Sequence, residues 1–340
     1  MSYLFWPRRV VFEKDALSYS KGEKLYRYFT SLDVPISYTT SHNRVTGIPG
    51  RTSLEKFNEA KKTLVVGVRR TLDFQSCRPS ANYQLPLVTG CPGRCHYCYL
   101  HTSLGKTPYL RVYVNVEEVL KASQKYIKER DPEITSFEGS AVSDPFFAEP
   151  FTGAVSEAVS FFAMQPQGRF RMVTKYAIVD PILSLAHRKN TFIRFSVNND
   201  KIIQKYEKGT SPLNQRLEAA KKVLKAGYPT GLMVAPIFLE DNWKEDYKEL
   251  FKTMSSLMPQ EAPLSFELIT HRFTLRAKKH IAEIFPYTDL PMEESNRRFK
   301  YGQFGYGKYL YPKEIWDEAQ DYFHEILERN FPKAKVEYYI

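Results

Sequence analysis

Three cysteines fall within eight positions of the 340-residue chain, at Cys91, Cys95 and Cys98. Three residues and then two separate them, and this spacing is typical of a loop that binds an open [4Fe–4S] cluster. Three thiolates leave one iron of a four-iron cluster without a protein ligand. That iron can bind the amino and carboxylate groups of S-adenosylmethionine, whose reductive cleavage yields a 5′-deoxyadenosyl radical. The spacing therefore predicts radical chemistry, with the cluster and S-adenosylmethionine as cofactors.

Zinc is the alternative metal for the same cysteines. A structural zinc site takes four protein ligands, so His96 or Cys77 would have to complete it. His96 stands between two of the cysteines, where we expect its side chain to point elsewhere. The four cysteines of the chain are too few for a disulfide framework, which indicates metal binding in a reducing compartment.

The composition is that of a globular protein, with 43% hydrophobic and 26% charged residues. The net charge of +11 favours a polyanionic partner, of which nucleic acid is the usual one. No apolar run approaches the length of a membrane span, and the first residues lack the features of a signal peptide. We therefore expect a cytoplasmic protein with no membrane contact.

The elements that must position the cysteines follow from the hydrophobic periodicity. In the first eighty residues, helices are predicted at 15–32 and 53–61 and strands at 35–39 and 63–68. Further strands are predicted at 83–89, 134–140, 169–175, 191–198, 229–238 and 263–270. Helices are predicted at 116–130, 153–164, 179–187, 213–226, 243–258 and 313–330.

Six strand–helix units with short connections indicate a parallel sheet, open or curled into a partial barrel. The predicted fold class is α/β, a partial (β/α)6 TIM-type barrel with an N-terminal α/β extension and a C-terminal hairpin plus helix. The predicted parts are the extension at 1–80, the barrel at 81–270 and a hairpin with a closing helix at 271–340.

In such a barrel, chemistry gathers at the carboxyl ends of the strands. The cysteine loop follows the first barrel strand. Polar residues follow the later strands, namely Ser143, Asp144, Lys175, Ser196, Asn198, His271 and Arg272. A lone Ser or Lys at a strand end is more often a solvated loop residue than a functional one. The list therefore needs support from a wider pattern.

That pattern comes from a resemblance to a known family. The cysteine motif reads GCPGRCHYCYL at 90–100 and is followed by TPYLRVYVN at 107–115. Other stretches are TTSHNRVTGIPG at 39–50, TLVVGVRRTL at 63–72, GTSPLNQRLEAAKKVLKAGYP at 209–229 and FELITHRFT at 266–274. With these stretches in this order, the chain resembles the spore photoproduct lyases over nearly its whole length.

The resemblance implies a partial (β/α)6 barrel that repairs 5-thyminyl-5,6-dihydrothymine, an ultraviolet lesion of spore DNA. In the family, hydrogen abstraction from the dihydrothymine half is followed by fragmentation of the methylene bridge. A cysteine thiol then quenches the remaining thymine radical, and tyrosines help to return the hydrogen. The implied partners are lesion-containing DNA, with the lesion flipped out of the stack, and an external one-electron reductant. A monomer in the spore core or the germinating cell is also implied.

The resemblance also assigns roles to residues. Tyr97 and Tyr99 occupy the tyrosine positions of the motif and are candidates for hydrogen return and for packing on the cofactor. Ser143, Lys175 and Ser196 match residues that line S-adenosylmethionine. The predicted substrate-binding residues are Arg69, Arg70, His271, Arg272, Gln303 and Phe304.

Three departures from the family pattern stand out. Ala141 fills the position of the usual donor cysteine, and alanine has no weak bond to hydrogen. Cys77 is the one cysteine outside the motif, so either it has taken over the donor role or it is an inert buried thiol. A further alternative is that Ala141 is an engineered substitution. Gln303-Phe304 replaces an Arg-Tyr pair of the C-terminal hairpin, and PFFAEPFTG follows Asp144 in place of the usual run.

Three functions are open at this stage. The first is repair of the spore photoproduct by a carbon–carbon lyase. The second is a divergent radical enzyme that acts on another thymine lesion or a modified base. The third is a non-catalytic, metal-stabilised nucleic-acid-binding protein, which would need a fourth protein ligand and would not cleave S-adenosylmethionine.

Overall fold

Two sheets carry the fold of this protein, as seen in a computed structural model that describes residues 5–42, 45–105, 107–301 and 307–340. The first sheet has the order β2 (Ile36–Thr39), β1 (Arg9–Glu13), β3 (Thr63–Gly67), β8 (Leu110–Tyr113) and β6 (Val88–Thr89). Its first four strands are parallel, and β6 is antiparallel to β8. Every residue of β3 is buried, which is typical of a strand covered on both faces.

The second sheet is a curled half-barrel. Its order is β4 (Ser76–Cys77), β5 (Ala81–Gln84), β9 (Thr135–Glu138), β10 (Gly168–Thr174), β11 (Thr191–Val197), β13 (Thr230–Ile237), β14 (Ser265–Thr270) and β17 (Lys335–Tyr339). All neighbours are parallel except β4 and β5. Buried residues alternate with less buried ones along β10, because successive side chains of a strand point to opposite faces.

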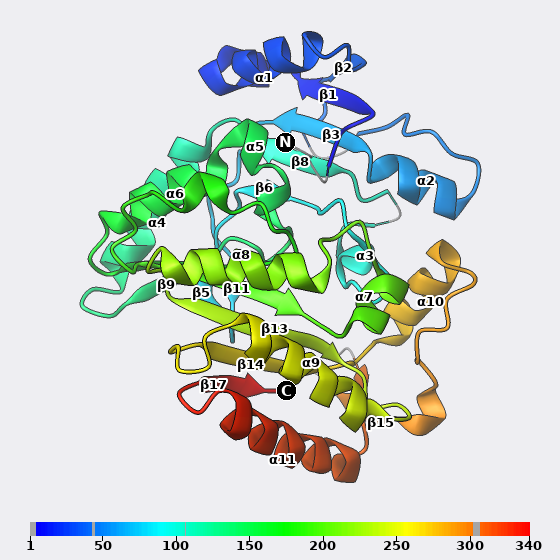
Figure 1. Ribbon diagram of the computed structural model, residues 1–340. Helices are drawn as coiled ribbons and strands as arrows, with labels where there is room; N and C mark the ends of the chain where they lie inside the picture. Colours follow the sequence, from blue (N-terminus) through cyan, green and yellow to red (C-terminus); the bar gives the residue numbers. More distant parts are fainter. Residues whose placement is uncertain (1–4, 43–44, 106, 302–306) are drawn as a thin grey trace.

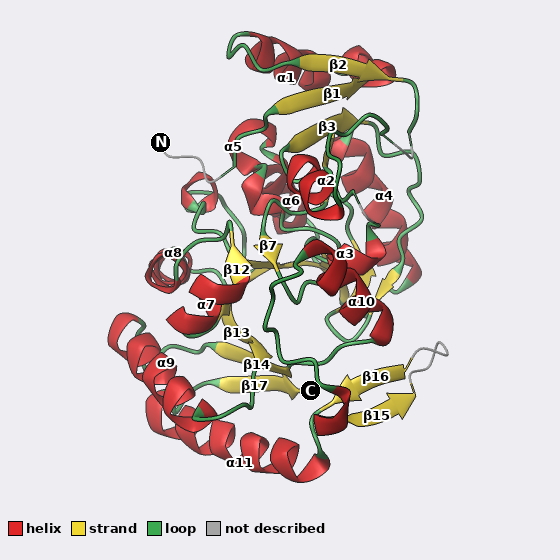
Figure 2. Cartoon of the chain, turned by 90° about the vertical axis from the view of Figure 1, so that its right-hand side faces the viewer, coloured by secondary structure: helices red, strands yellow, loops and turns green. Residues whose placement is uncertain are grey.

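Helices connect the strands and cover the sheets (Figures 1 and 2). Those of the first sheet are α1 (Ser20–Thr30) and α2 (Ser53–Ala60). Those of the half-barrel are α4 (Val116–Glu129), α6 (Ala154–Ala163), α8 (Leu213–Lys225), α9 (Trp243–Leu257) and α11 (Lys313–Asn330). Thr52 and Glu55 form a capping box that starts α2, because each side chain accepts a hydrogen bond from the other residue's backbone N–H.

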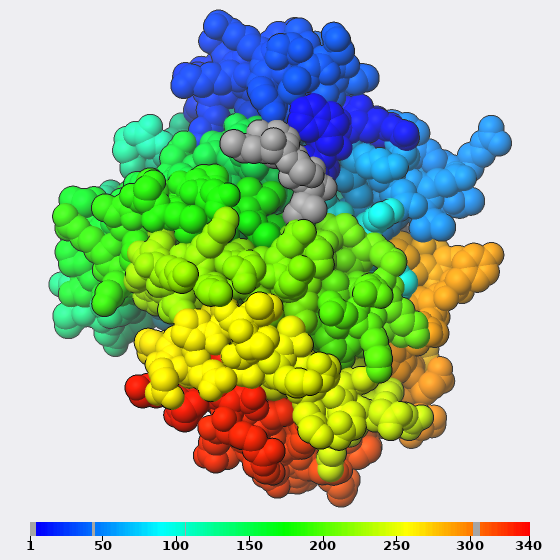
Figure 3. Space-filling view, in the orientation of Figure 1, coloured from blue at the N-terminus to red at the C-terminus, as the bar shows by residue number. Residues whose placement is uncertain are grey.

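Shorter elements complete the chain. They are β7 (Arg94–Cys95), α3 (Leu100–Ser103), α5 (Glu149–Thr152), α7 (Asp200–Tyr206), β12 (Glu207–Lys208), α10 (Leu275–Ile284) and the hairpin of β15 (Arg298–Tyr301) with β16 (Gly307–Leu310). In the space-filling view the N-terminal layer lies at one end of the molecule, and α9 and α11 lie at the other (Figure 3). Among the described residues, no helix has the length and apolar character needed to cross a bilayer.

The predicted fold class is confirmed, and all six predicted barrel strands contribute to the half-barrel. Two element predictions were wrong. The strand predicted at 83–89 is split into β5 and β6, which belong to different sheets, and Pro86 between them cannot donate to a ladder. The helix predicted at 179–187 is only a 3-10 turn at Asp180–Ile182, which contains Pro181.

Candidate active site

The cysteine loop leaves the first sheet at the end of β6. Gly90 turns the chain with a φ of 82°, and a Cβ at this position would lie 2.8 Å from the carbonyl oxygen of Tyr109, so only glycine fits. Cys91 follows directly. Cys95 ends β7, which pairs antiparallel with β12, so that Cys95 lies opposite Glu207. Cys98 then leads into α3.

The thiol of Cys91 lies among hydrogen-bond donors. The backbone N–H of Gly93 donates to Cys91 Sγ at 3.4 Å, and the hydroxyl of Tyr176 lies 3.4 Å from the same sulfur. Lys61 Nζ donates to the carbonyl oxygen of Cys91 at 2.6 Å. Burial raises the pKa of Cys91 to about 11 and also raises those of Cys95 and Cys98. Bound iron deprotonates thiols outright, and N–H···S contacts tune the potential of iron–sulfur clusters.

The donor set fits a cubane cluster better than a single ion. Among the described residues, no group of three or more His, Cys, Asp or Glu side chains converges on the point where one ion would bind. A cubane instead takes each thiolate on a separate iron. Neither fourth ligand of the zinc alternative points to the cysteines, because His96 Nδ1 lies 2.8 Å from Thr288 Oγ1 and its ring stacks on Phe285. Cys77 lies near Glu138 and Arg194 instead.

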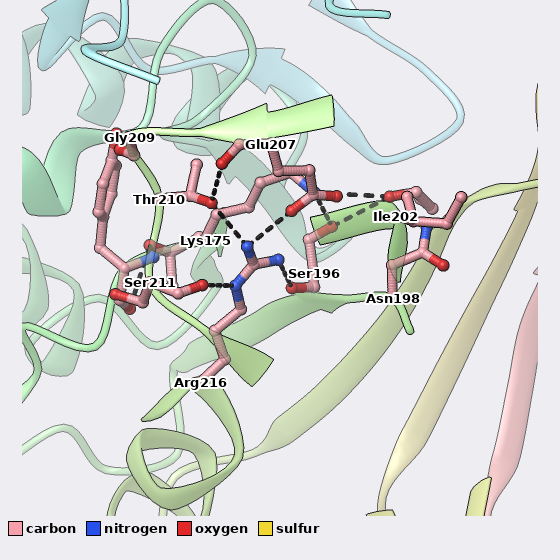
Figure 4. A network of polar contacts seen from close by, with 12 residues as sticks. Lys175, Ser196, Asn198, Ile202, Glu207, Gly209, Thr210, Ser211 and Arg216 are labelled. Carbon is pink, nitrogen blue, oxygen red and sulfur yellow. Dashed lines mark hydrogen bonds and ion pairs between the residues drawn. The ribbon is translucent and has the colours of Figure 1, made fainter. Parts of the chain in front are cut away.

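A buried polar network lies beside the loop, and Figure 4 shows it from close by. Lys175, at the end of β10, donates from Nζ to Ser196 Oγ at 2.8 Å and to Glu207 Oε1 at 2.9 Å. The hydroxyl of Tyr97 donates to the same carboxylate oxygen, and Lys175 Nζ lies 5.6 Å from the centre of the Tyr97 ring. Glu207 therefore brings together three residues that were predicted to line the cofactor, namely Tyr97, Lys175 and Ser196. We name these four residues, together with Arg216, the Glu207 network.

Arg216 of α8 holds the other side of the carboxylate. Its Nη2 donates to Glu207 Oε2 at 2.6 Å, and its remaining donors bind the carbonyl oxygens of Ser196 and Ser211 and the hydroxyl of Thr210. Both side chains of the pair are fully buried. Burial alone would raise the pKa of Glu207, but the nearby Lys175 and Arg216 charges lower it to about 2. The carboxylate is therefore ionised throughout the physiological pH range.

A second loop, after β9, lies against the cysteine loop. The backbone N–H of Gly90 donates to the carbonyl oxygen of Val142 at 3.0 Å, and Gly90 bridges to Ser143. Ser143 is buried beside the start of the cysteine loop, and its role in cofactor binding stays a prediction. Asp144 accepts hydrogen bonds from Thr174 Oγ1 and Lys175 N, but its burial is the larger effect and raises its pKa to about 6.

Cys77, Tyr99 and Ala141 form a second neighbourhood, which we name the Cys77 side. The hydroxyl of Tyr99 donates to the carbonyl oxygen of Ala141. Burial of this hydroxyl raises the pKa of Tyr99, and negative charge on Cys98 or Cys77 raises it further. Cys77 is half-buried in β4, and burial together with the charge of Glu138 raises its pKa to about 11. Cys77 is therefore a protonated thiol at neutral pH.

The predicted substrate-binding residues lie in separate places. Arg69 and Arg70 follow β3 in the first sheet, whereas His271 and Arg272 follow β14 of the half-barrel. His271 is buried, and among the described residues its Nδ1 has no hydrogen-bond partner. Burial lowers its pKa to about 3, so the ring is neutral. Gln303 and Phe304 lie outside the described residues.

Glu207, Arg216 and Tyr176 are absent from the predicted site residues. Arg216 lies inside the matching stretch at 209–229, and Glu207 stands two residues before it. A Glu and an Arg nine positions apart are common in any sequence. Only their burial would have indicated a functional pair, and burial cannot be read from the sequence.

The half-barrel and the three-cysteine loop at its edge define a radical S-adenosylmethionine enzyme. The model of the spore photoproduct lyase family matches residues 5–340, and the chain belongs to that family. The spore photoproduct lyase of Clostridium acetobutylicum is 47% identical over 333 residues, with 98% of each chain covered. That of Bacillus subtilis is 45% identical over 337 residues, again with 98% of each chain covered.

Solved structures agree with this family assignment. A spore photoproduct lyase complexed with dinucleoside spore photoproduct matches with a TM-score of 0.95 and 46% identity over 99% of both chains. A double mutant of spore photoproduct lyase with bound AdoMet and dinucleoside spore photoproduct matches with a TM-score of 0.95 and 47% identity, also over 99% of both chains. A Cys is replaced by Ala and a Ser by Cys in that mutant.

Proposed function

We propose that this chain is a carbon–carbon lyase that reverses the spore photoproduct to two thymines. The observation that carries the proposal is the match, over 99% of both chains, to a spore photoproduct lyase complexed with dinucleoside spore photoproduct. The chemistry of the site supports it, because a three-thiolate loop lies next to a buried network of cationic and hydroxyl donors. The net charge of +11 suits a lesion that is part of a polyanion.

Cys91, Cys95 and Cys98 would hold a [4Fe–4S] cluster, and Ser143, Lys175 and Ser196 would bind S-adenosylmethionine. When bound, the cluster and S-adenosylmethionine supply the 5′-deoxyadenosyl radical that starts repair by hydrogen abstraction. Lys175 is already oriented by hydrogen bonds to Ser196 Oγ, Glu207 Oε1 and the carbonyl oxygen of Ala235. Such preorganised donors bind a carboxylate without first having to be ordered.

We further propose Cys77 as the hydrogen donor that replaces the cysteine missing at Ala141. In that step the S–H bond of Cys77 would break and a C–H bond would form on the thymine radical. Tyr99 and Tyr97 would then pass a hydrogen atom from 5′-deoxyadenosine to the sulfur radical, so that S-adenosylmethionine would be regenerated. Donation needs a thiol and not a thiolate, and the raised pKa of Cys77 keeps it protonated. The combination of Ala141 with Cys77 also has the residue types of the double mutant that was solved with bound AdoMet.

The partners proposed for this activity are DNA that carries the lesion and an external one-electron reductant. The protein would act as a monomer, inside the spore core or the germinating cell where the lesion occurs. Arg69, Arg70, His271 and Arg272 are the proposed contacts to substrate.

The test is anaerobic reconstitution of the cluster, followed by addition of dithionite, S-adenosylmethionine and a dinucleotide that carries the lesion. We expect thymidylyl-thymidine to accumulate over many turnovers. Formation of 5′-deoxyadenosine without repaired thymine would instead favour a divergent radical enzyme with another substrate.

The donor assignment is tested with three variants in the same assay. Cys77→Ala should lose clean repair and release side products, and the double variant Cys77→Ala with Ala141→Cys should recover it. Ala141→Cys alone is the matched control and should retain repair. Full repair by Cys77→Ala would exclude Cys77 as the donor but leave the lyase activity standing.

A further inference from the structure

A basic pocket of about 910 Å³ lies on the first sheet, outside the Glu207 network. Five cationic side chains line it, and among its described lining residues there is no Asp or Glu. These cations are Arg51, Lys56, Arg69, Arg70 and Arg111. The volume is within the range of pockets that hold nucleotide-sized ligands.

The topology of the first sheet explains why a pocket forms here. The chain passes from β1 to β2 on one side and then returns to β3 on the other side of β1. In parallel α/β sheets, ligands bind at such a switch point, outside the carboxyl ends of the strands. Arg69 and Arg70 directly follow β3, and His42 follows β2, so the lining comes from these ends.

Glu13, at the end of β1, lies beneath the pocket and holds two of its lining residues, Arg111 and Val68, in place. It is fully buried and accepts hydrogen bonds from Arg111 Nη1 at 2.6 Å and from the backbone N–H of Val68 at 3.2 Å. His42 Nδ1 lies 3.1 Å from the same carboxylate. The negative charge of Glu13 is therefore used inside the protein to orient Arg111.

The four cations of the pocket other than Arg111 have fewer carboxylate partners than charges, so the pocket carries net positive charge. Arg70 is paired with Asp15. Within the described part of the chain, no carboxylate lies at ion-pair distance from Arg51, Lys56 or Arg69, and the side chains of Arg51 and Lys56 are exposed. The guanidinium of Arg69 lies 5.8 Å from the centre of the Tyr113 ring, which holds it along the wall. Several cations around a concave surface bind phosphate oxygens in preference to other anions of the cell.

The pocket is also next to the cysteine loop. Thr89, which lines it, stands two residues before Cys91, and its hydroxyl lies 2.8 Å from the hydroxyl of Tyr113. Ser103 to Gly105, at the end of α3, form another part of the wall. The pocket wall and the cysteine loop are therefore parts of one continuous stretch of chain, from Thr89 to Gly105.

We propose that this pocket binds a phosphate-bearing nucleotide, and that the nucleotide belongs to the DNA strand that flanks the lesion. The DNA source rests on the proposed function. A free nucleotide offers the same phosphate chemistry, so the experiment has to distinguish the two sources.

The test uses Arg51→Gln with Lys56→Gln, because both side chains are exposed and outside the catalytic machinery. Lys248→Gln with Lys252→Gln on α9 is the control, since it removes the same charge from an exposed helix face. Binding of a labelled single-stranded oligonucleotide is followed by anisotropy at several salt concentrations. The pocket variant should bind about tenfold more weakly, and its salt slope should fall by about one for each cation removed. The control should change by much less.

Two further measurements distinguish DNA from a free nucleotide as the source of the phosphate. They also separate the proposal of a nucleotide-binding pocket from the proposed lyase activity. Repair of the lesion dinucleotide, which has no flanking phosphates, should be equal in all three proteins, and thymidine monophosphate should not compete with the oligonucleotide. If thymidine monophosphate competed with the oligonucleotide for the unmodified protein but not for the pocket variant, the pocket would bind a free nucleotide. Equal oligonucleotide and nucleotide binding by the variant and the control would overturn the pocket. Failure of dinucleotide repair in every protein would refute the proposed lyase activity, and the anisotropy would still report on the pocket.

A charge-preserving variant, Arg51→Lys with Lys56→Arg, guards against a folding artefact. It should restore most of the affinity for the oligonucleotide, because long-range attraction to phosphates needs charge more than shape. An affinity as low as that of the glutamine variant would mean that the substitutions disturb the fold, and would overturn the charge argument.

Discussion

The Glu207 network and the Cys77 side flank the same cysteine loop, yet they are built differently. Glu207 accepts three charge-assisted or hydroxyl hydrogen bonds and is fully buried together with Arg216. On the Cys77 side, Tyr99 as a whole residue is 59% exposed although its hydroxyl is buried, and this hydroxyl makes a single described hydrogen bond, to a backbone carbonyl.

The roles proposed for the two sides would account for this difference. Charges that are removed from water must be paired with good geometry, and a fully paired network is rigid. Such rigidity suits a cofactor that binds in one orientation. Hydrogen transfer between sulfur, carbon and phenol oxygen instead requires small approaches of the reacting groups, which sparse bonding permits. The two sides should therefore respond very differently to substitution.

The largest effect is expected from Arg216→Met, which removes the charge but keeps most of the side-chain volume. Glu207 would lose its fully buried cationic partner and keep only the partly exposed Lys175, and breaking a buried ion pair costs about 3–5 kcal/mol. Urea unfolding of the variant measures this loss. The control is Arg329→Met on α11, whose pair with Glu325 is 71% and 70% exposed and should change stability by less than about 0.5 kcal/mol. Equal losses would mean that the buried pair has no special role.

Acid should weaken the Glu207 network next. The pKa of Glu207 is about 2 in the folded protein against an ordinary value of 4.5, so its stabilising effect is complete above about pH 4.5 and is lost as the pH falls toward 2. The shift corresponds to about 3 kcal/mol. Unfolding of cluster-free protein across this range should therefore show a slope that Glu207→Gln reduces. The exposed Glu325→Gln should keep the slope, and an unchanged slope in Glu207→Gln would contradict the assignment.

The sequence predicted the cysteine loop and the residues at the strand ends better than it predicted the buried ion pair beside them. The cysteine loop was found from the spacing of its cysteines, and Lys175 and Ser196 were found because they stand at the carboxyl ends of strands with clear periodicity. The loop was expected after the first barrel strand, but it follows β6 of the first sheet. Glu207 and Arg216 were missed because their partnership depends on the pairing of β12 with β7, which no local pattern specifies. Hydrophobic periodicity is measured over windows of ten or more residues, so it cannot predict which two-residue strands pair with each other.

Other parts of the prediction divide in the same way. The strand predicted at 83–89 has the right composition, but Pro86 lets the chain cross from one sheet to the other. The first sheet includes β6 and β8, which lie beyond residue 80 in the chain, and the division into three parts stays a prediction. The roles of Cys77, Tyr97, Tyr99 and the substrate-binding residues also stay predictions, which need activity measurements.

On the Cys77 side, the third test is thiol reactivity. The pKa of Cys77 is raised from 9.0 to about 11, by burial and by the charge of Glu138, so its thiolate is scarce near pH 8. Alkylation by iodoacetamide should be roughly a hundredfold slower in the folded protein than in urea, because only the thiolate reacts. Mass spectrometry of the peptide that contains Cys77 measures both rates. Equal rates would mean that Cys77 is an ordinary exposed thiol and would weaken its proposed role as donor.

The smallest effect is expected from Tyr99→Phe. It removes one hydrogen bond between two neutral groups, from the hydroxyl to the carbonyl oxygen of Ala141, so the loss in unfolding free energy should be about 1 kcal/mol. The matched control is Tyr97→Phe, which removes a hydrogen bond to the buried carboxylate of Glu207 and should cost about 1.5–3 kcal/mol. The two phenylalanine variants differ by two positions in one loop, so urea unfolding of both compares the two sides directly. If Tyr99→Phe cost as much as Tyr97→Phe, the Cys77 side would be as rigid as the Glu207 network, and hydrogen transfer would have to occur within a fixed geometry.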